Sequence, residues 1–376
     1  MKNIIFFKPG AQIENTGDLL INKSEIDVLR HYGDIIVDDS NTPEWFINAI
    51  SNTLVDKKLS EVSKSSLNST FLKNLLSGNK GGIKTRFYYV IAPGHRSAKG
   101  FKSAQRSLFA GLKNLTFKLL GGRVMRMGFS IGPFDKLNGW ADSLISGTYY
   151  YFGLRDNKAI TLAQQLNFSK PQYFPDLAWC YTPYPENSDI ARKDSGYVVL
   201  SFRSNEYGTS HNENYLVPIV NKIKDLLRSV EGVKKIVLAY QVQYDRDAAV
   251  YMQQQLNDNF ETELVDHKLL LPEAEALYRN ATFVLSNRLH VLMLAFQCNT
   301  VAIPLIKLED NKKIVGIYTD NGLGDIILDA EQESLILHAS LNSTLASKER
   351  FIEIFKYASE RNTQLIRQKL DTIFNA

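Results

Sequence analysis

The segment Ser286-Asn287-Arg288-Leu289-His290 joins an arginine and a histidine at the start of an apolar stretch, residues 291–296. If that stretch is a helix, its first amides are free to bind an anion. A histidine also exchanges a proton near neutral pH. The alternative is a histidine that only caps a buried helix. Because an arginine and a histidine are costly to bury without partners, the segment favours a site that binds an anion and moves a proton.

A second arginine, Arg203, follows the apolar run 197–202 and lies among Ser201, Ser204 and Asn205. A guanidinium group beside hydroxyls at the carboxyl end of a strand suits a phosphate or a carboxylate. A solvated surface arginine explains this segment equally well. Arg203 is therefore a candidate ligand for the same anion as Arg288.

Two motifs in the N-terminal half could contact a ligand, one directly before a predicted helix and one directly after a predicted strand. Asn15-Thr16-Gly17-Asp18 leads into a helical stretch, and its glycine would let backbone amides approach a ligand. By itself this motif favours an ordinary helix start capped by Asp18. His95 follows the apolar run 87–92, where ligands of open α/β sheets bind, and is a candidate for proton transfer or acceptor contact. An ordinary surface histidine is the competing interpretation.

Two further motifs end strands in the same half, Gly128-Phe129-Ser130-Ile131-Gly132-Pro133 and Arg155-Asp156, and Asp176 of Pro175-Asp176 closes this lobe. The Gly-Pro pair breaks its strand and aims a loop towards the strand ends. For Arg155-Asp156 we favour a structural role, in which the pair binds the backbone of a loop.

Apolar runs that alternate with helical stretches predict two Rossmann-like lobes with parallel sheets. The predicted strands are residues 3–7, 35–37, 87–92, 124–131, 196–202, 235–239, 283–286 and 300–304. The predicted helices are residues 46–54, 213–227, 248–256 and 273–278.

Polar residues and prolines between residues 181 and 193 mark a domain boundary. We therefore expect an N-terminal lobe over residues 1–183, a C-terminal lobe over 194–346 and a final helix over 347–376. Residues 60–82 are expected to form one helix whose end, 78–82, is a loop.

The composition is that of a globular protein large enough for two domains, with 376 residues, 44% of them apolar, 22% charged, and a net charge of +4. A basic stripe interleaved with aromatic residues is missing, so nucleic-acid binding is not expected. The two cysteines, Cys180 and Cys298, lack metal-ligand spacing, and we expect reduced thiols and no metal site.

The apolar run near the N-terminus is shorter than the core of a signal peptide, and no stretch is long enough to span a bilayer. We therefore expect a cytoplasmic protein. Its small positive charge allows a loose, peripheral contact with the acidic inner face of the membrane.

The ordered series N-x-G-D, G-x-S-x-G-P, R-D, P-D, a strand-end arginine and R-L-H resembles the polysaccharide pyruvyl transferases. Here it is formed by Asn15 to Asp18, Gly128 to Pro133, Arg155-Asp156, Pro175-Asp176, Arg203, and Arg288-Leu289-His290. The resemblance runs from the first strand to about Lys313. Two pieces depart from the family pattern: Cys298-Asn299-Thr300 replaces Gly-x-Pro, and a glycine-rich loop is reduced to Pro93-Gly94-His95.

The resemblance implies a GT-B-like fold with the active site in the cleft between the lobes and a C-terminal helix that crosses back to the first lobe. It also implies phosphoenolpyruvate as co-substrate, without a cofactor, and a sugar or lipid-linked oligosaccharide of capsule or exopolysaccharide biosynthesis as acceptor. In that framework Arg203, Arg288 and the amides of Leu289 and His290 bind phosphoenolpyruvate, and His290 is the general acid.

On the acceptor side, Asn15 and Gly17 are expected to contact substrate, and Asp18 or His95 to orient or deprotonate the sugar. Two other functions stay open. One is a glycosyltransferase that uses a nucleotide sugar, for which Glu273 to Glu275 would bind the donor. The other is a relative that binds sugar without catalysis.

Overall fold

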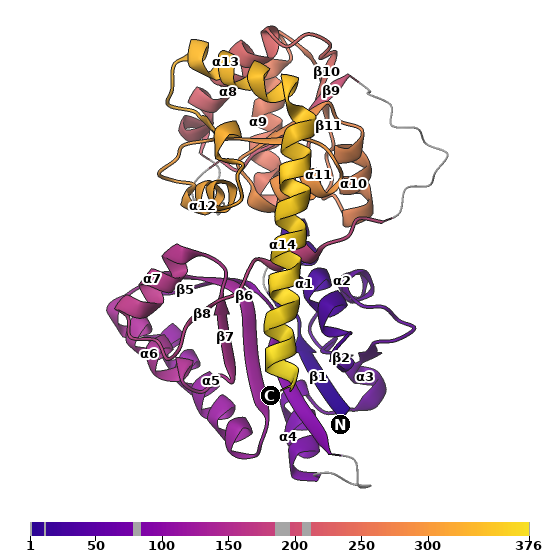
Figure 1. The fold of residues 1–376 in the computed structure, drawn as a ribbon, viewed down its shortest axis with the longest axis vertical. Coiled ribbons are helices and arrows are strands. Elements are labelled where there is room, and N and C mark those ends of the chain that lie inside the picture. The colour runs from indigo at the N-terminus through magenta and orange to yellow at the C-terminus, as the bar shows by residue number, and fades with distance from the viewer. Residues whose placement is uncertain (1, 11–12, 78–83, 185–195, 205–211, 376) are drawn as a thin grey trace. The chain divides into compact units, whose positions relative to one another are not determined.

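A computed structural model describes residues 2–10, 13–77, 84–184, 196–204 and 212–375. Asn205, the expected loop 78–82 and most of the expected boundary 181–193 lie outside the described residues. The chain divides into two compact units (Figure 1). Unit 1 comprises Met1–Ile13, Asp18–Cys180 and Asn362–Ala376, and unit 2 comprises Glu14–Gly17 and Tyr181–Arg361.

The observed division differs from the expected one in two places. The N-terminal unit ends at Cys180 rather than at residue 183, because Tyr181 and Tyr184 donate hydrogen bonds to Glu275 of unit 2. Glu14–Gly17 belong to unit 2, although they precede most of unit 1 in the sequence.

Unit 1 is built on a parallel sheet whose strands follow the order β3-β2-β1-β4-β6-β7-β8, with β5 pairing to β6. The strands are β1 Lys2–Lys8, β2 Asp34–Val37, β3 Lys57–Lys58, β4 Thr85–Ile91, β5 Gly94–Ala98, β6 Arg123–Phe134, β7 Tyr151–Leu154 and β8 Gln172–Tyr173. Runs such as Phe87 to Val90 are buried throughout, as expected for strands covered on both faces.

The helices of unit 1 are α1 Thr16–Leu29, whose first two residues lie in unit 2, α2 Glu44–Ile50, α3 Leu59–Val62, α4 Leu67–Ser77, α5 Phe101–Leu119, α6 Lys136–Ser146 and α7 Asn157–Gln165. An aromatic cluster joins helix to sheet: Phe71 meets Phe6, Tyr89 and Phe117 edge-on, with ring centroids 5.2, 5.3 and 4.8 Å away. Residues 60–82 were expected to hold one helix, but Ser63 to Ser66 separate α3 from α4, and serines there hydrogen-bond locally instead of continuing a helix.

Unit 2 contains a second parallel sheet, with the order β11-β10-β9-β12-β13-β14. Its strands are β9 Tyr197–Ser201, β10 Lys235–Leu238, β11 Glu261–Leu264, β12 Phe283–Ser286, β13 Ala302–Ile306 and β14 Leu328–Asp329. Its helices are α8 Glu213–Arg228, α9 Arg246–Leu256, α10 Leu271–Arg279, α11 Leu289–Gln297, α12 Lys312–Asp320 and α13 Ser334–Ala346. The strand order reverses between β9 and β12, which makes their carboxyl ends the place where ligands bind in such sheets.

The final helix, α14 Lys348–Asn375, belongs to both units, as the resemblance implied. Within unit 2, Phe355 stacks on Phe296 with ring centroids 4.8 Å apart. Within unit 1, Phe374 stacks on Tyr32 at 4.9 Å, and Asp371 accepts a hydrogen bond from the Tyr32 hydroxyl at 2.9 Å. These contacts fix each half of the helix to its own unit.

Candidate active site

Arg203 and Arg288 follow the carboxyl ends of two neighbouring strands. Strands β9 and β12 pair in parallel with Ser201 opposite Ser286, and each arginine comes two residues after its serine. Since the strand order reverses between β9 and β12, both arginines lie at the switch point of the unit 2 sheet.

Two buried side chains tie the strand-end loops together. Asn287 accepts a hydrogen bond from the Arg203 amide at 2.8 Å and donates one to the Arg203 carbonyl at 3.0 Å. Ser286 donates to the Ser201 carbonyl at 2.5 Å and accepts from the Arg288 amide at 2.9 Å. The backbone that carries both arginines is therefore fixed before any ligand binds.

One of the two guanidinium groups is paired with a buried carboxylate, and the other is hydrogen-bonded to an amide. Arg288 Nη2 donates to Asp245 Oδ1 at 2.5 Å, and Arg203 Nη2 donates to Asn311 Oδ1 at 2.7 Å. Burial raises the pKa of Asp245, and the positive charges of Arg288 and Arg203 oppose that rise. The structure thus brings the two arginines predicted from separate segments to the same place.

Hydrogen-bond donors gather at the start of α11. The Nε of Arg288 is buried and makes no hydrogen bond within the described residues. Arg288 is the N-cap of α11, and the first intrahelical donor is the Leu292 amide, 3.1 Å from the Arg288 carbonyl. The amides of Leu289 and His290 precede it and are not used within the helix. A guanidinium group and a helix N-terminus together suit an anion.

His290 lies against the N-terminal motif. A Cβ atom added to Gly17 would be only 2.6 Å from His290 Nδ1 and 3.0 Å from His290 Cβ. The Thr16 amide donates to the Gln241 carbonyl at 3.0 Å, and Asn15 forms an antiparallel bridge with Val242. The expectation that Asn15 and Gly17 belong to the N-terminal lobe is therefore wrong, because these backbone bonds attach them to unit 2.

Asp18 and His95, in contrast, belong to unit 1. Asp18 is buried in the first turn of α1 and does not cap it: Asn15 Oδ1 accepts the Gly17 amide at 2.8 Å and takes that role. His95 is exposed and lies in β5, where it pairs with Ser130, rather than in a loop.

Arg155 and Asp156 have the structural role favoured from the sequence, but Arg155 binds side chains rather than the backbone of a loop. Arg155 donates to Asp176 at 2.6 Å and to Ser130 Oγ at 2.9 Å. Asp156 accepts from Ser130 Oγ and caps α7 by accepting the Ala159 amide at 2.7 Å. The network links Ser130, inside β6, to the end of β7 and holds the Arg155 side chain against Asp176.

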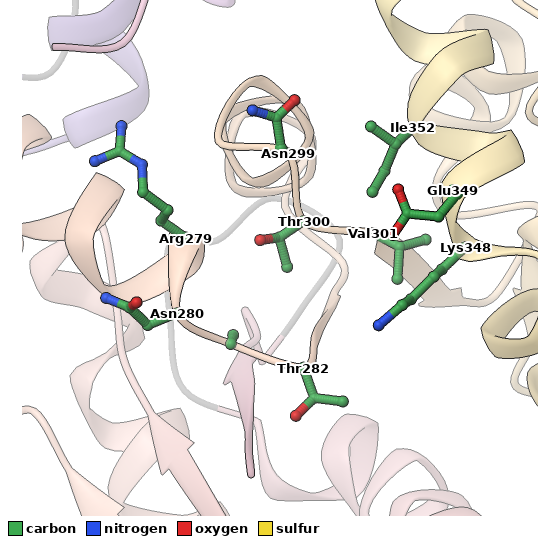
Figure 2. A pocket seen from close by; sticks show the side chains of 10 residues that line it. Arg279, Asn280, Thr282, Asn299, Thr300, Val301, Lys348, Glu349 and Ile352 are labelled. Carbon is green, nitrogen blue, oxygen red and sulfur yellow. The ribbon is translucent and has the colours of Figure 1, made fainter. Parts of the chain in front are cut away.

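A small pocket of about 110 Å³ in unit 2 lies away from the arginines (Figure 2). It is lined by residues that precede β12 and β13, such as Thr282 and Val301, and by Lys348 of α14. The pocket therefore opens at the amino ends of these strands, whereas Arg203 and Arg288 follow the carboxyl ends. Among the described residues, no group of three or more His, Cys, Asp or Glu side chains is arranged to hold a metal ion.

Asp245 and Asn311 were not predicted from the sequence. Asp245 ends the short turn before α9, on the segment that follows β10, and Asn311 immediately precedes α12. Polar residues directly before a helix at the carboxyl side of a parallel sheet were the available signal. Asn287 was noted in its segment but not as the residue that fixes Arg203.

Two doubly wound α/β domains of this kind are those of the GT-B fold. The chain is similar to Anabaena Alr3699/HepE in complex with UDP, with a TM-score of 0.59, 12% identity and 100% of each chain covered. It is also similar to a mutant of S. aureus TarM in complex with fondaparinux, alpha-GlcNAc-glycerol and UDP, with a TM-score of 0.59, 9% identity and 100% of each chain covered. Methanocaldococcus jannaschii UDP-GlcNAc 2-epimerase, in complex with UDP-GlcNAc and UDP, gives a TM-score of 0.52 at 15% identity, with 95% of this chain and 100% of that chain covered.

The family to which the protein belongs follows from its amino-acid sequence. The model of the polysaccharide pyruvyl transferase family matches residues 15–306, and the chain belongs to that family. No protein of curated function matches the chain in sequence. No helix in the described part of the chain is long and apolar enough to cross a membrane.

Proposed function

We propose that this enzyme transfers a pyruvyl group from phosphoenolpyruvate to two hydroxyls of one sugar residue and so forms a cyclic ketal in a capsule or exopolysaccharide. The observation that carries the proposal is that Arg203 and Arg288 follow two paired strands at the switch point of the unit 2 sheet, beside the start of α11. Family membership supports the reaction class.

Phosphoenolpyruvate presents a phosphate and a carboxylate around an enol carbon. In the proposal Arg203 and Arg288 bind the phosphate, and the amides of Leu289 and His290 add fixed donors. The ion pair with Asp245 orients Arg288 in advance, and its unused Nε supplies one donor to the substrate. Two guanidinium groups and one buried carboxylate leave a net positive charge for the anion.

His290 is proposed as the general acid that protonates the donor methylene, which makes the central carbon electrophilic. A sugar hydroxyl then bonds to that carbon and the bond to phosphate breaks. A second hydroxyl of the same sugar closes the ketal. One hydroxyl proton replaces the proton given to the methylene, and the other leaves with the phosphate. Gly17 places backbone directly against His290, so it sets the position of the ring.

The acceptor is proposed to be a sugar residue, free or on a lipid-linked oligosaccharide, handled at the cytoplasmic face of the membrane. Asp18 or His95 of unit 1 would orient or deprotonate it. The chemistry requires neither a metal ion nor a further cofactor.

A nucleotide-sugar donor is the second candidate, because the structures similar in fold include several solved with UDP. The acidic residues considered for such a donor are Glu273 and Glu275. Glu275 is buried and accepts hydrogen bonds from the Tyr181 hydroxyl and the Tyr184 amide. Glu273 contacts His267. Because the Glu275 carboxylate already accepts these two hydrogen bonds, it is a poor ligand for a nucleotide sugar, and phosphoenolpyruvate is the favoured donor.

The test compares the donors on the wild-type protein. Phosphoenolpyruvate should raise the unfolding temperature and UDP should not, since only a bound ligand stabilises the folded state. Incubation with phosphoenolpyruvate and a panel of sugar acceptors should release phosphate. Stabilisation by UDP alone would favour the nucleotide-sugar donor, and sugar binding without donor consumption would indicate a non-catalytic relative.

A further inference from the structure

Helices α5 and α6 of unit 1 expose large apolar side chains to solvent. On α5 these are Phe101, Phe109, Leu112, Leu115 and Leu119, and on α6 they are Leu137, Trp140 and Leu144. Phe109 is 63% exposed and Trp140 is 57% exposed. We call these eight side chains the α5–α6 face. A contiguous apolar set of this kind on a folded protein marks an interaction surface.

The two helices lie side by side, so their outer sides form one surface (Figure 1). Ser107 of α5 donates to Asp142 of α6 at 3.1 Å, and a Cβ atom on Gly111 would overlap the side chain of Ile145. Lys118 near the end of α5 donates to the Gly147 carbonyl after α6 at 3.0 Å. Residues later in α5 contact residues later in α6, so the two helices run parallel to each other.

The buried residues of α5 and α6 show which side of each helix faces the rest of unit 1. Ala104, Gly111 and Phe117 of α5 are buried, and so are Ala141 and Ile145 of α6. The apolar residues on the opposite sides are left uncovered by the described part of the chain. On α6, Leu137, Trp140 and Leu144 are spaced so that all three fall on one outward stripe.

Exposed basic side chains occur on α5, on α6 and directly before α5. The exposed ones are Lys99, Lys102, Arg106, Lys118 and Lys136. Helix α5 contains no acidic residue, and the only acid of α6, Asp142, is buried and paired with Arg96. Asp135, the N-cap of α6, accepts hydrogen bonds from the amides of Gly100 and Asn138.

We propose that the α5–α6 face docks on a bilayer containing anionic phospholipid. Apolar side chains would enter the boundary between headgroups and acyl chains, and the lysines would meet the lipid phosphates. A second copy of this chain fits the surface less well, because a twofold contact would bring the same basic residues together. The inference does not rest on the proposed reaction, although docking would bring the enzyme to a lipid-linked acceptor.

The experiment sediments the full-length protein with vesicles of phosphatidylcholine, with and without phosphatidylglycerol. We expect strong binding only when phosphatidylglycerol is present, and a shift of Trp140 emission to shorter wavelength that Trp140→Phe abolishes. Phe109→Ser/Leu112→Ser should lower the partition coefficient by about tenfold for each side chain removed. Lys102→Gln/Lys136→Gln should lower it by about fivefold for each lysine, and only on the anionic vesicles.

The matched control is Leu335→Ser/Ile336→Ser, which removes two exposed apolar side chains from α13 in unit 2. It should sediment like the wild type. Absence of sedimentation, equal binding by the Phe109→Ser/Leu112→Ser protein, or a wild-type dimer that this variant dissociates would overturn the proposal. Leu144→Ser serves as a second test if the double variant unfolds. No donor or acceptor is present, so failure of pyruvyl transfer leaves the result unaffected.

Discussion

The contact between Gly17 and His290 gives a prediction that depends on a single methyl group. In Gly17→Ala, the new Cβ would lie 2.6 Å from His290 Nδ1, and the two atoms must separate by 0.8 Å to reach the 3.4 Å of ordinary contact. The imidazole ring of His290 must therefore move, or the backbone at Gly17 in the first turn of α1 must move away from the ring. Misplacing a catalytic group by such a distance lowers transfer about a hundredfold. Donor affinity should change little, because Arg288 is held separately by Asp245.

The assay measures phosphate release from phosphoenolpyruvate with a saturating acceptor, and donor affinity by calorimetry on the same preparations. Gly316→Ala is the control, since Gly316 of α12 has nothing within 4 Å of an added Cβ and should behave like the wild type. The reasoning is refuted if Gly17→Ala retains wild-type turnover, or if turnover and donor affinity fall in equal measure.

Three further substitutions test the structure around the site. Burial raises the pKa of Glu25 well above its ordinary value, and the positive charge of Arg126 opposes the rise. As the pH increases, the unfolded chain therefore loses the Glu25 proton before the folded protein does, and the stability of the folded state falls. Glu25→Gln should remove this pH dependence of stability, measured by urea unfolding from acid to mildly alkaline pH. Asn287→Ala removes both bonds to the Arg203 backbone, and the unsatisfied groups should cost about 1–3 kcal/mol and weaken donor binding in calorimetry. Arg155→Met leaves Asp176 as a buried unpaired charge and should destabilise unit 1 by about 3–5 kcal/mol. Thermal unfolding measures this effect, and an unchanged melting temperature would contradict a stabilising role of the Arg155–Asp176 ion pair.

The central strands of both sheets were predictable because they are buried on both faces and read as continuous apolar runs. Residues 283–286, for example, match β12 Phe283–Ser286. Edge strands gave no such signal. The strand β11 Glu261–Leu264 has three polar residues before its only apolar one and is partly exposed, and β8 Gln172–Tyr173 is only two residues long. Their pairing depends on neighbours that local sequence does not reveal.

Arg203, Arg288 and His290 could be selected as candidates because their residue types are costly to bury and follow predicted strands, and their roles stay a prediction. The placement of Asn15 and Gly17 was not, since it depends on backbone bonds to residues more than 200 positions away, such as the 3.0 Å bond from the Thr16 amide to Gln241. Asp245 was missed for a related reason: its importance comes from its contact with Arg288, and no local pattern marks that contact.

The most direct test of the account measures phosphoenolpyruvate binding and phosphate release in Arg288→Ala and His290→Ala side by side. We expect Arg288→Ala to lose donor binding itself. His290→Ala should bind the donor nearly as well as the wild type while release falls by about 10²–10⁴-fold, the range for loss of a general acid. Near-wild-type release by His290→Ala, or full donor affinity in Arg288→Ala, would contradict it.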